Sequence, residues 1–243
     1  MKPGKAPNLK VERMWMAGGH GLVGGSDEVG RGSLGGPVSA GVVVVDDSTK
    51  RPPAGLRDSK LLTPSARQAL VPRIEQWARA WGVGHASAAE IDSVGLLRAL
   101  RLAGERAMAQ LAHFPGVVVL DGNYDWYRRP APVPQSRPAV EPPHVELRIK
   151  ADLTCASVAA ASVLAKVKRD RLMEELAVEY PDYGWATNKG YATRFHLVAL
   201  RELGPSLQHR RSWRLPRRGE ALPEGELADD VIDLDRYANQ GLA

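Results

Sequence analysis

The chain of 243 residues has one cysteine, two phenylalanines and no long apolar run. Cys155 alone cannot form a disulfide within the chain, so we expect a reducing compartment, the cytoplasm. With phenylalanine this scarce, the core must be mainly aliphatic. The most apolar stretch, residues 155–165, is too short to span a bilayer. No apolar segment follows the basic residues 1–5, so we expect neither a secretory signal nor membrane attachment.

Acidic residues are scarce in most of the chain and concentrated at its end. The net charge is +5, but residues 219–243 contain seven acids and one base, so residues 1–218 carry +11. A basic body suits a polyanion such as nucleic acid, although charge that serves only solubility gives the same count. We expect the acidic tail to be disordered.

Short apolar runs alternate with helical patterns along the chain, which predicts an α/β layered domain. The expected strands are 22–27, 38–45, 81–86, 117–120 and 145–149, and the expected helices are 8–16, 63–80, 87–111, 157–180 and 193–204. The valines at 42–45 do not alternate with polar residues, so we expect that strand to be buried on both faces, between helices. We expect Pro72 to kink or break its helix, and the proline-rich stretch 127–143 to be a surface excursion.

The stretch 25–37 carries two adjacent carboxylates, Asp27 and Glu28, and then glycines around a single arginine. Carboxylate oxygens are the ligands that Mg²⁺ and Mn²⁺ prefer, and backbone N–H groups in glycine turns bind anions. Arg31, between two glycines, suits a phosphate-bearing substrate. A simple turn with a solvated acidic pair would show the same pattern.

Two further acids, Asp121 and Asp152, also follow short apolar runs. Active sites of α/β sheets gather at strand ends, so these side chains are expected to converge with the first pair. Four carboxylates repel one another unless cations neutralise them, which suits two-metal hydrolysis of a phosphodiester. Taken singly, Asp121 also fits a turn before Gly122, and Asp152 fits a helix N-terminus.

Several sequence blocks occur together and in a fixed order. They are Asp-Glu-Val-Gly-Arg-Gly at 27–32, Asp-Ser-Lys at 58–60, Asp-Gly at 121–122, Lys-Ala-Asp at 150–152, the alanine-rich stretch 157–166, Tyr-Gly-Trp at 183–185, Lys-Gly-Tyr-Ala-Thr at 189–193 and His-Arg-Arg-Ser at 209–212. On these blocks the sequence resembles bacterial ribonuclease HII, over residues 22–213.

The resemblance implies a ribonuclease H-like mixed sheet with helices on both faces, plus a small helical C-terminal region. We therefore expect a leader with a short helix at 1–20, a catalytic domain at 21–178, a basic helical region at 179–218 and the acidic tail at 219–243. The resemblance also implies a monomer. Its expected reaction is metal-assisted cleavage 5′ of ribonucleotides embedded in duplex DNA, and of the RNA strand of RNA–DNA hybrids.

The resemblance assigns catalysis and the binding of a divalent metal, Mn²⁺ or Mg²⁺, to Asp27, Glu28, Asp121 and Asp152. The proline-rich insert lengthens the spacing between the last two acids, so Asp125 stays an alternative ligand. We choose Asp121 because it ends the apolar run.

The substrate-binding residues that the resemblance implies are Gly30, Arg31, Gly32, Lys60, Lys166 and Tyr191. The glycine–arginine turn would read the ribose 2′-hydroxyl, the tyrosine would pack on the next sugar, and the two lysines would contact phosphates or the acids. Ser33 stands where the family usually has proline or a small apolar residue, and we expect this to change only the stiffness of the loop.

Two other function classes compete with this interpretation. A non-catalytic nucleic-acid-binding module would need the basic body but gives no reason for four acids at strand ends. A DNA-specific resolvase or a hybrid-only ribonuclease H would share the metal chemistry and differ in substrate. A P-loop is excluded because no lysine and serine or threonine close the glycine turn.

Other reactive residue types are given structural roles. Cys155 is expected to be a small buried hydrophobic residue, and Trp77, Trp81 and Trp185 to be packing residues. His209 lies beside two arginines, but no second histidine is spaced to form a metal site with it.

Overall fold

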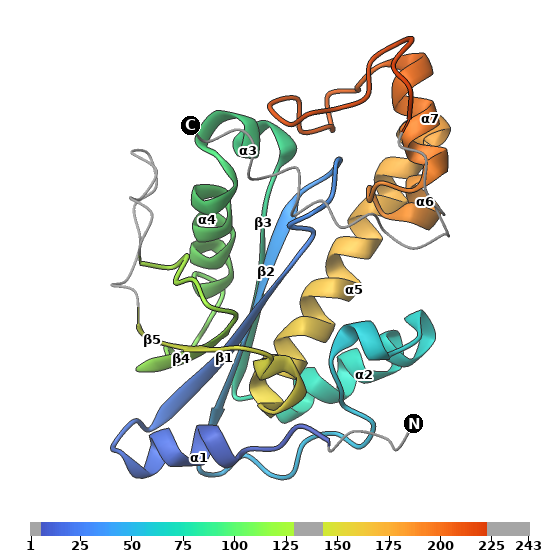
Figure 1. Cartoon of the computed structure of the whole chain (residues 1–243). Coiled ribbons are helices and arrows are strands. Elements are labelled where there is room, and N and C mark those ends of the chain that lie inside the picture. The colour runs from blue at the N-terminus through green and yellow to red at the C-terminus, as the bar shows by residue number, and fades with distance from the viewer. Residues whose placement is uncertain (1–5, 129–142, 223–243) are drawn as a thin grey trace.

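The computed structural model describes residues 6–128 and 143–222, which form a mixed sheet covered by helices (Figure 1). Its strands are β1 Leu22–Val29, β2 Val38–Asp46, β3 Ala80–Ala86, β4 Val117–Asp121 and β5 His144–Arg148. The strand order is β3-β2-β1-β4-β5. β2 pairs antiparallel with β1 and β3, while β4 is parallel to β1 and β5. The expected mixed sheet is confirmed.

Helices cover both faces of the sheet. They are α1 Lys10–Ala17, α2 Pro64–Trp77, α3 Ala88–Val94, α4 Leu96–Met108, α5 Ala156–Glu179, α6 Trp185–Asn188 and α7 Arg194–Leu203, with short 3₁₀ turns η1 Ser59–Leu61, η2 Ala151–Leu153 and η3 Pro181–Tyr183. α4 and α5 lie on opposite sides of β2, and α6 and α7 lie beside the C-terminal end of α5 (Figure 1). No helix in the described part of the chain has the length and apolarity needed to cross a membrane.

Glycines in the strands let both helices approach the sheet closely. A side-chain carbon at Gly41 of β2 would lie 2.5 Å from the carbonyl oxygen of Ala161 on α5. At Gly84 of β3 it would collide with the carbonyl oxygen of Ala103 on α4. The valines at 42–45 between these helices are fully buried, as expected for a strand covered on both faces.

Local signals at helix ends are confirmed. Thr63 and Thr193 cap α2 and α7, and Ser87 forms a capping box with Glu90 at the start of α3. The N-terminus of α5 is capped by a residue that lies far away in the sequence. The buried carboxylate of Glu12 on α1 accepts hydrogen bonds from the N–H and hydroxyl of Ser157, at 2.9 and 2.7 Å.

Three local expectations are wrong. The helix expected at 87–111 is two helices, α3 and α4, because the chain turns at Gly95 with φ +80°. The expected break of α2 at Pro72 does not occur, while a kink there stays a prediction. Tyr127 does not begin a surface excursion. Its ring is buried and stacks on Trp126 at 4.1 Å. The rest of the proline-rich stretch, and nearly all of the acidic tail, lie outside the described residues.

Candidate active site

The first two candidate acids lie at the end of β1, in the middle of the sheet. Asp27 pairs with Gly41 and Glu28 with Ala40 of β2. The Asp27 carboxylate is buried, and its Oδ1 accepts a hydrogen bond of 2.8 Å from the N–H of Glu28. Because the neighbouring residue on β2 is a glycine, the Asp27 side chain has no bulky cross-strand neighbour on that side.

The other two acids are brought to the same edge by the parallel strand β4, which ends at Asp121, and by the turn η2, which contains Asp152. Ser26 of β1 is paired with Leu120 of β4, so Asp121 follows beside Asp27. The Oδ1 of Asp121 accepts a hydrogen bond of 2.6 Å from the N–H of Ala151, which precedes Asp152 in η2. The register of β1 and β4 therefore places Asp121 beside Asp27, and the hydrogen bond from Ala151 brings η2, with Asp152, to the same place.

Burial and like charge make three of these carboxylates, those of Asp27, Glu28 and Asp152, hard to ionise. The pKa of Asp27 is raised well above its usual value, first by burial and then by the charges of Glu28 and Asp121. The pKa of Glu28 is also raised by burial, and Arg31 opposes this shift. Burial and the charges of nearby aspartates raise the pKa of Asp152 to about 6. A bound cation would remove this penalty.

Lys60 is a basic side chain that faces this group of acids. Burial would lower its pKa, but the charges of Asp27, Asp58 and Asp152, together with Asp121, raise it. Lys60 follows Asp58, which accepts a hydrogen bond of 3.0 Å from the Lys60 N–H. The ammonium group thus offsets part of the negative charge at the strand ends.

The donor set fits a hard divalent cation. All four candidate ligands are carboxylates, and Mg²⁺ and Mn²⁺ prefer oxygen ligands. The pKa values of Asp27, Glu28 and Asp152 are raised by burial and like charge, which a cation would offset. Within the described residues, no group of three or more histidine, cysteine, aspartate or glutamate side chains is already arranged so that it could hold a metal ion. Asp125, the alternative ligand, instead accepts a hydrogen bond of 3.0 Å from the N–H of Arg128 in a local turn.

The glycine–arginine turn follows directly after the acids. Arg31 is half exposed, and its Nη1 lies 3.6 Å from a carboxylate oxygen of Glu28. Gly30 has φ +83°, and Arg169 packs where its side chain would be. A side chain at Gly32 would meet no atom within 4 Å. Gly30 is therefore required by the fold, whereas Gly32 faces open space.

The remaining candidates sit on and beside α5. Lys166 Nζ is bonded to Asp170 at 2.8 Å and lies 5.6 Å from the centre of the Tyr191 ring. Arg169 lies 5.4 Å from the same ring centre. Tyr191 is half buried, with two cations near its ring. Cys155 is fully buried, and its raised pKa of about 11 keeps the thiol protonated, as expected for a packing residue.

Sequence reasoning missed a buried network of hydrogen-bonded side chains near Tyr191. Trp185 Nε1–H donates to His196 Nε2 at 3.1 Å, and the Nε2 atoms of His196 and His209 are 3.0 Å apart. Ser206 N–H donates to His209 Nδ1, so the His209 proton is on Nε2. His196 Nδ1–H then donates to the carbonyl of Tyr191 at 2.9 Å. His209 does have a histidine partner, contrary to expectation, and the pair is structural.

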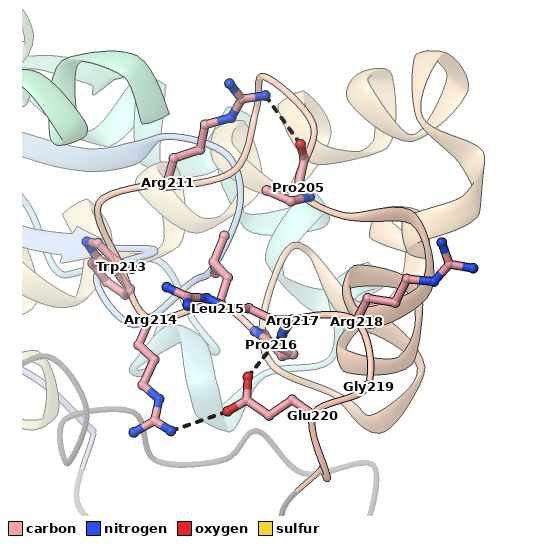
Figure 2. A pocket seen from close by; sticks show the side chains of 10 residues that line it. All are labelled: Pro205, Arg211, Trp213, Arg214, Leu215, Pro216, Arg217, Arg218, Gly219 and Glu220. Carbon is pink, nitrogen blue, oxygen red and sulfur yellow. Dashed lines mark hydrogen bonds and ion pairs between the residues drawn. The ribbon is translucent and has the colours of Figure 1, made fainter.

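A pocket of about 860 Å³ lies in the C-terminal segment. Figure 2 shows its lining, which includes Trp213, Leu215, Glu220 and the arginines Arg211, Arg214, Arg217 and Arg218. Arg214 is paired with Glu220 at 3.2 Å, and Arg211 donates to the carbonyl of Pro205. Four guanidinium groups and one carboxylate give the lining a net positive charge.

Comparison with known proteins shows which family the sequence matches. The family model described as Ribonuclease HII matches residues 24–215. The chain is 42% identical to ribonuclease HII of Streptomyces avermitilis, covering 87% of this chain and 85% of the relative. It is 44% identical to ribonuclease HII of Caulobacter vibrioides, covering 88% of this chain and 92% of the relative.

Solved structures are similar over most of the chain. Ribonuclease H2 from Pyrococcus horikoshii OT3 superposes with a TM-score of 0.62 at 26% identity, covering 79% of this chain and 93% of that one. RNase HII from Archaeoglobus fulgidus, solved in complex with PCNA, gives a TM-score of 0.60 at 25% identity and covers 81% and 97%. Bst-RNase HIII in complex with Mn²⁺ shares the fold, with a TM-score of 0.56 at 22% identity, and covers 75% and 63%.

Proposed function

The chain belongs to the ribonuclease HII family and is a ribonuclease H acting on RNA–DNA hybrids, and from this premise we propose which residues carry the reaction. We propose that Asp27, Glu28, Asp121 and Asp152 hold divalent cations, Mn²⁺ or Mg²⁺. The observation that carries this assignment is their convergence from β1, β4 and η2. When bound, such ions supply Lewis-acid stabilisation of the phosphodiester that is hydrolysed.

The glycine–arginine turn determines which substrate is cleaved. The 2′-hydroxyl distinguishes RNA from DNA, and backbone groups can reach it only where side chains are absent. Gly32 faces open space directly after Arg31, whose guanidinium lies beside Glu28. Arg31 holds the phosphate next to the acids, and the backbone of Gly30 and Gly32 contacts the ribose.

Tyr191 and the lysines complete the proposed substrate contacts. Tyr191 packs on the sugar that follows the ribonucleotide, where a second 2′-hydroxyl would crowd its ring. Lys60 faces the acids and contacts the phosphate there. Lys166, paired with Asp170 beside the Tyr191 ring, contacts the next phosphate. The arginine-lined pocket and the basic body hold the rest of the duplex without reading its sequence.

Cleavage is therefore expected 5′ of a single ribonucleotide embedded in duplex DNA, by a monomer acting in the cytoplasm. The test compares three duplexes of one sequence, namely all-DNA, DNA with one ribonucleotide, and an RNA–DNA hybrid. We expect one cut in the second duplex, cuts in the hybrid, and none in the first. An uncut lone ribonucleotide beside a well-cut hybrid would contradict the proposal.

The two competing functions predict different results in the same assay. A binding module would cut none of the three duplexes, and a resolvase-like enzyme would cut the all-DNA duplex. Gly32→Val directly tests the recognition of the ribose by the glycine–arginine turn, because the new side chain meets only open space in the free protein. We expect this variant to lose cleavage at the lone ribonucleotide while its affinity for all-DNA duplex changes little.

A further inference from the structure

Two arginines are fully buried beneath the glycine–arginine turn. Arg169 of α5 and Arg210 of the C-terminal segment both have 0% exposure. Neither forms an ion pair with any carboxylate among the described residues, whereas buried charges in proteins are normally paired. We call residues 30–37 the glycine loop. Within the described part of the chain, all hydrogen bonds of the Arg210 guanidinium go to backbone carbonyls of this loop, and those of Arg169 go to the loop and to the carbonyl of Lys189.

Arg169 binds the second half of the glycine loop. Its Nε donates to the carbonyl of Pro37 at 2.9 Å, and its Nη2 donates to Ser33 Oγ at 2.8 Å and to the carbonyl of Gly35 at 3.3 Å. Its Nη1 donates to the carbonyl of Lys189 at 3.0 Å, two residues before Tyr191. Ser33, the departure from the family pattern, therefore ties the loop to Arg169 rather than only changing its stiffness.

Arg210 binds the first half. Its Nη1 donates to the carbonyl of Arg31 at 2.7 Å, and its Nη2 donates to the carbonyl of Gly30. Weaker bonds of 3.4 Å reach the carbonyl of Gly36, and the guanidinium lies 4.7 Å from the centre of the Trp213 ring. The carbonyl groups on both halves of the loop thus point inward to a cation.

The other side of the loop is open. The backbone N–H groups of Gly30, Arg31 and Gly32 donate to no acceptor among the described residues. Gly32 faces open space, while Arg169 occupies the position beneath Gly30. Three consecutive N–H groups without an acceptor in the described part of the chain, next to two buried positive charges, are a donor set that can bind an anion.

We propose that Arg169 and Arg210 are positioning residues that hold the glycine loop with its N–H groups outward, and so determine the discrimination between ribose and deoxyribose. This inference rests on the proposed role of the loop as the ribose reader. Only a planar guanidinium offers five donors that can span several carbonyls, whereas a lysine ammonium offers three donors at one point.

The charge of the pair also acts on the ligand. Burial, and the neighbouring Arg169, lower the pKa of Arg210 to about 9, which still leaves it charged near neutral pH. Two unpaired positive charges beneath the loop favour an oxygen ligand, either phosphate or a hydroxyl, above it.

The test measures binding in EDTA, where no cleavage occurs, to an all-DNA duplex and to the same duplex with one ribonucleotide. The wild type is expected to prefer the second duplex. Arg169→Lys and Arg210→Lys keep the charge and are expected to reduce this preference at least tenfold, with little change in all-DNA affinity. The matched control is Arg171→Lys on the exposed face of α5, which is expected to keep the wild-type preference.

A purely structural role would lower both affinities together, through a smaller folded fraction, and would leave their ratio unchanged. If the folded lysine variants keep the wild-type ratio of the two duplex affinities, the inference is overturned, while the proposed role of the glycine loop in recognising the ribose is not affected. A wild type with no preference would overturn both.

If the variants fail to fold, amide hydrogen exchange in the wild type provides the second measurement. The N–H groups of Gly30, Arg31 and Gly32 are expected to exchange quickly in the free protein. They should become protected by the ribonucleotide duplex and less so by the all-DNA duplex. Equal protection by both duplexes, or protection in the free protein, would overturn the inference.

Discussion

The Asp27 side chain is buried near the end of a strand, and two further carboxylates lie close to it. Its raised pKa means that the ionised form is held at a cost in the metal-free protein. Asp121 also has a structural role, because its Oδ1 accepts a hydrogen bond from the N–H of Ala151. The two residues therefore differ in what their replacement should do to the fold.

The first prediction concerns these two acids. Asp27→Asn keeps the size but removes charge, so turnover should fall on the order of 100-fold or more. The melting temperature in EDTA should be unchanged or higher, because repulsion is relieved. Asp121→Asn should lose activity similarly. Turnover against Mg²⁺ and Mn²⁺ concentration, with calorimetry of metal binding, checks this.

Asp125→Asn is the matched control, because Asp125 holds only a local turn. Its turnover should stay near that of the wild type. Loss of activity in this variant with normal activity in Asp121→Asn would reverse the choice of ligand. Normal wild-type rates in EDTA would exclude metal-assisted hydrolysis altogether.

The sequence was informative about acids that end apolar runs, and less so about the residues that support them. Asp27 and Asp121 could be located because strands in a layered sheet end at a shared edge. Asp58 shifts the pKa of Asp152 across a gap of ninety-four positions, which no local pattern encodes. The burial of Arg169 and Arg210 was equally hidden, because exposed and buried arginines have the same local sequence signals.

Among the helices, α5 shows most directly how the sheet and the site are held together. Gly41 on β2 allows the helix backbone to approach, and Ser162 on the same face is hydrogen-bonded to Ser59 at 2.8 Å. Ser59 is the residue before Lys60. Any displacement of α5 from the sheet would therefore also move the lysine that faces the acids.

The second prediction is that Gly41→Ala destabilises the protein by about 1–3 kcal/mol, because the new carbon would lie 2.5 Å from the Ala161 carbonyl oxygen. Gly21→Ala is the control, since its side chain would meet nothing within 4 Å, and it should change stability by less than about 0.5 kcal/mol. Urea denaturation measures both. Equal effects of the two substitutions would contradict close packing of α5.

The C-terminal helices depend on the neutral histidine pair. Burial lowers the pKa of His196 to about 4, and burial together with His196 and Arg211 lowers that of His209 to about 3. Both values lie below the unfolded value of about 6.5. The unfolded chain thus binds protons first, so the pair's contribution is fully present above about pH 6.5 and is lost as the pH falls.

The third prediction compares the wild type with His196→Gln between pH 7.5 and pH 5. The stability advantage of the wild type should shrink by about 2 kcal/mol at pH 5, since each neutral histidine costs roughly that much there. Unfolding free energies from urea titrations at each pH provide the measurement. The difference removes contributions from the carboxylates, which are common to both proteins. A constant advantage across this range would mean that the pair is not neutral in the fold.

These histidines also show why part of the helical region could not be anticipated. They are thirteen positions apart in the sequence, on α7 and in the following segment, so no helical or metal-ligand spacing connects them. The division of the predicted 87–111 helix was more accessible, because it falls at Gly95. The boundaries proposed at 20, 178 and 218 stay predictions.

Over the whole molecule, charge is divided between a basic body and an acidic C-terminal stretch. Residues 223–243 contain six acids and one arginine, and they follow the arginine-lined pocket directly. Negative charge there would repel a nucleic-acid backbone. The effect should depend on salt, because counterions screen it beyond about 10 Å at 0.1 M ionic strength.

The fourth prediction is that removing residues 223–243 leaves the fold intact and raises duplex affinity by roughly threefold to tenfold at low salt. The dependence of affinity on salt should also become steeper. Binding titrations at several salt concentrations, with thermal unfolding as the control for folding, test this. A truncated protein that does not fold would show that these residues pack on the body.

The position of α5 in the chain also has a consequence for synthesis. The sheet face formed by β1 and β2 is covered by this helix, yet 109 residues separate the end of β2 at Asp46 from the start of α5 at Ala156. At about 5–20 residues per second, a ribosome needs roughly 5–20 s to make that stretch. Throughout this time the first hairpin has emerged with an apolar face that nothing yet covers. The nascent chain should therefore be a target for chaperones that act at the ribosome.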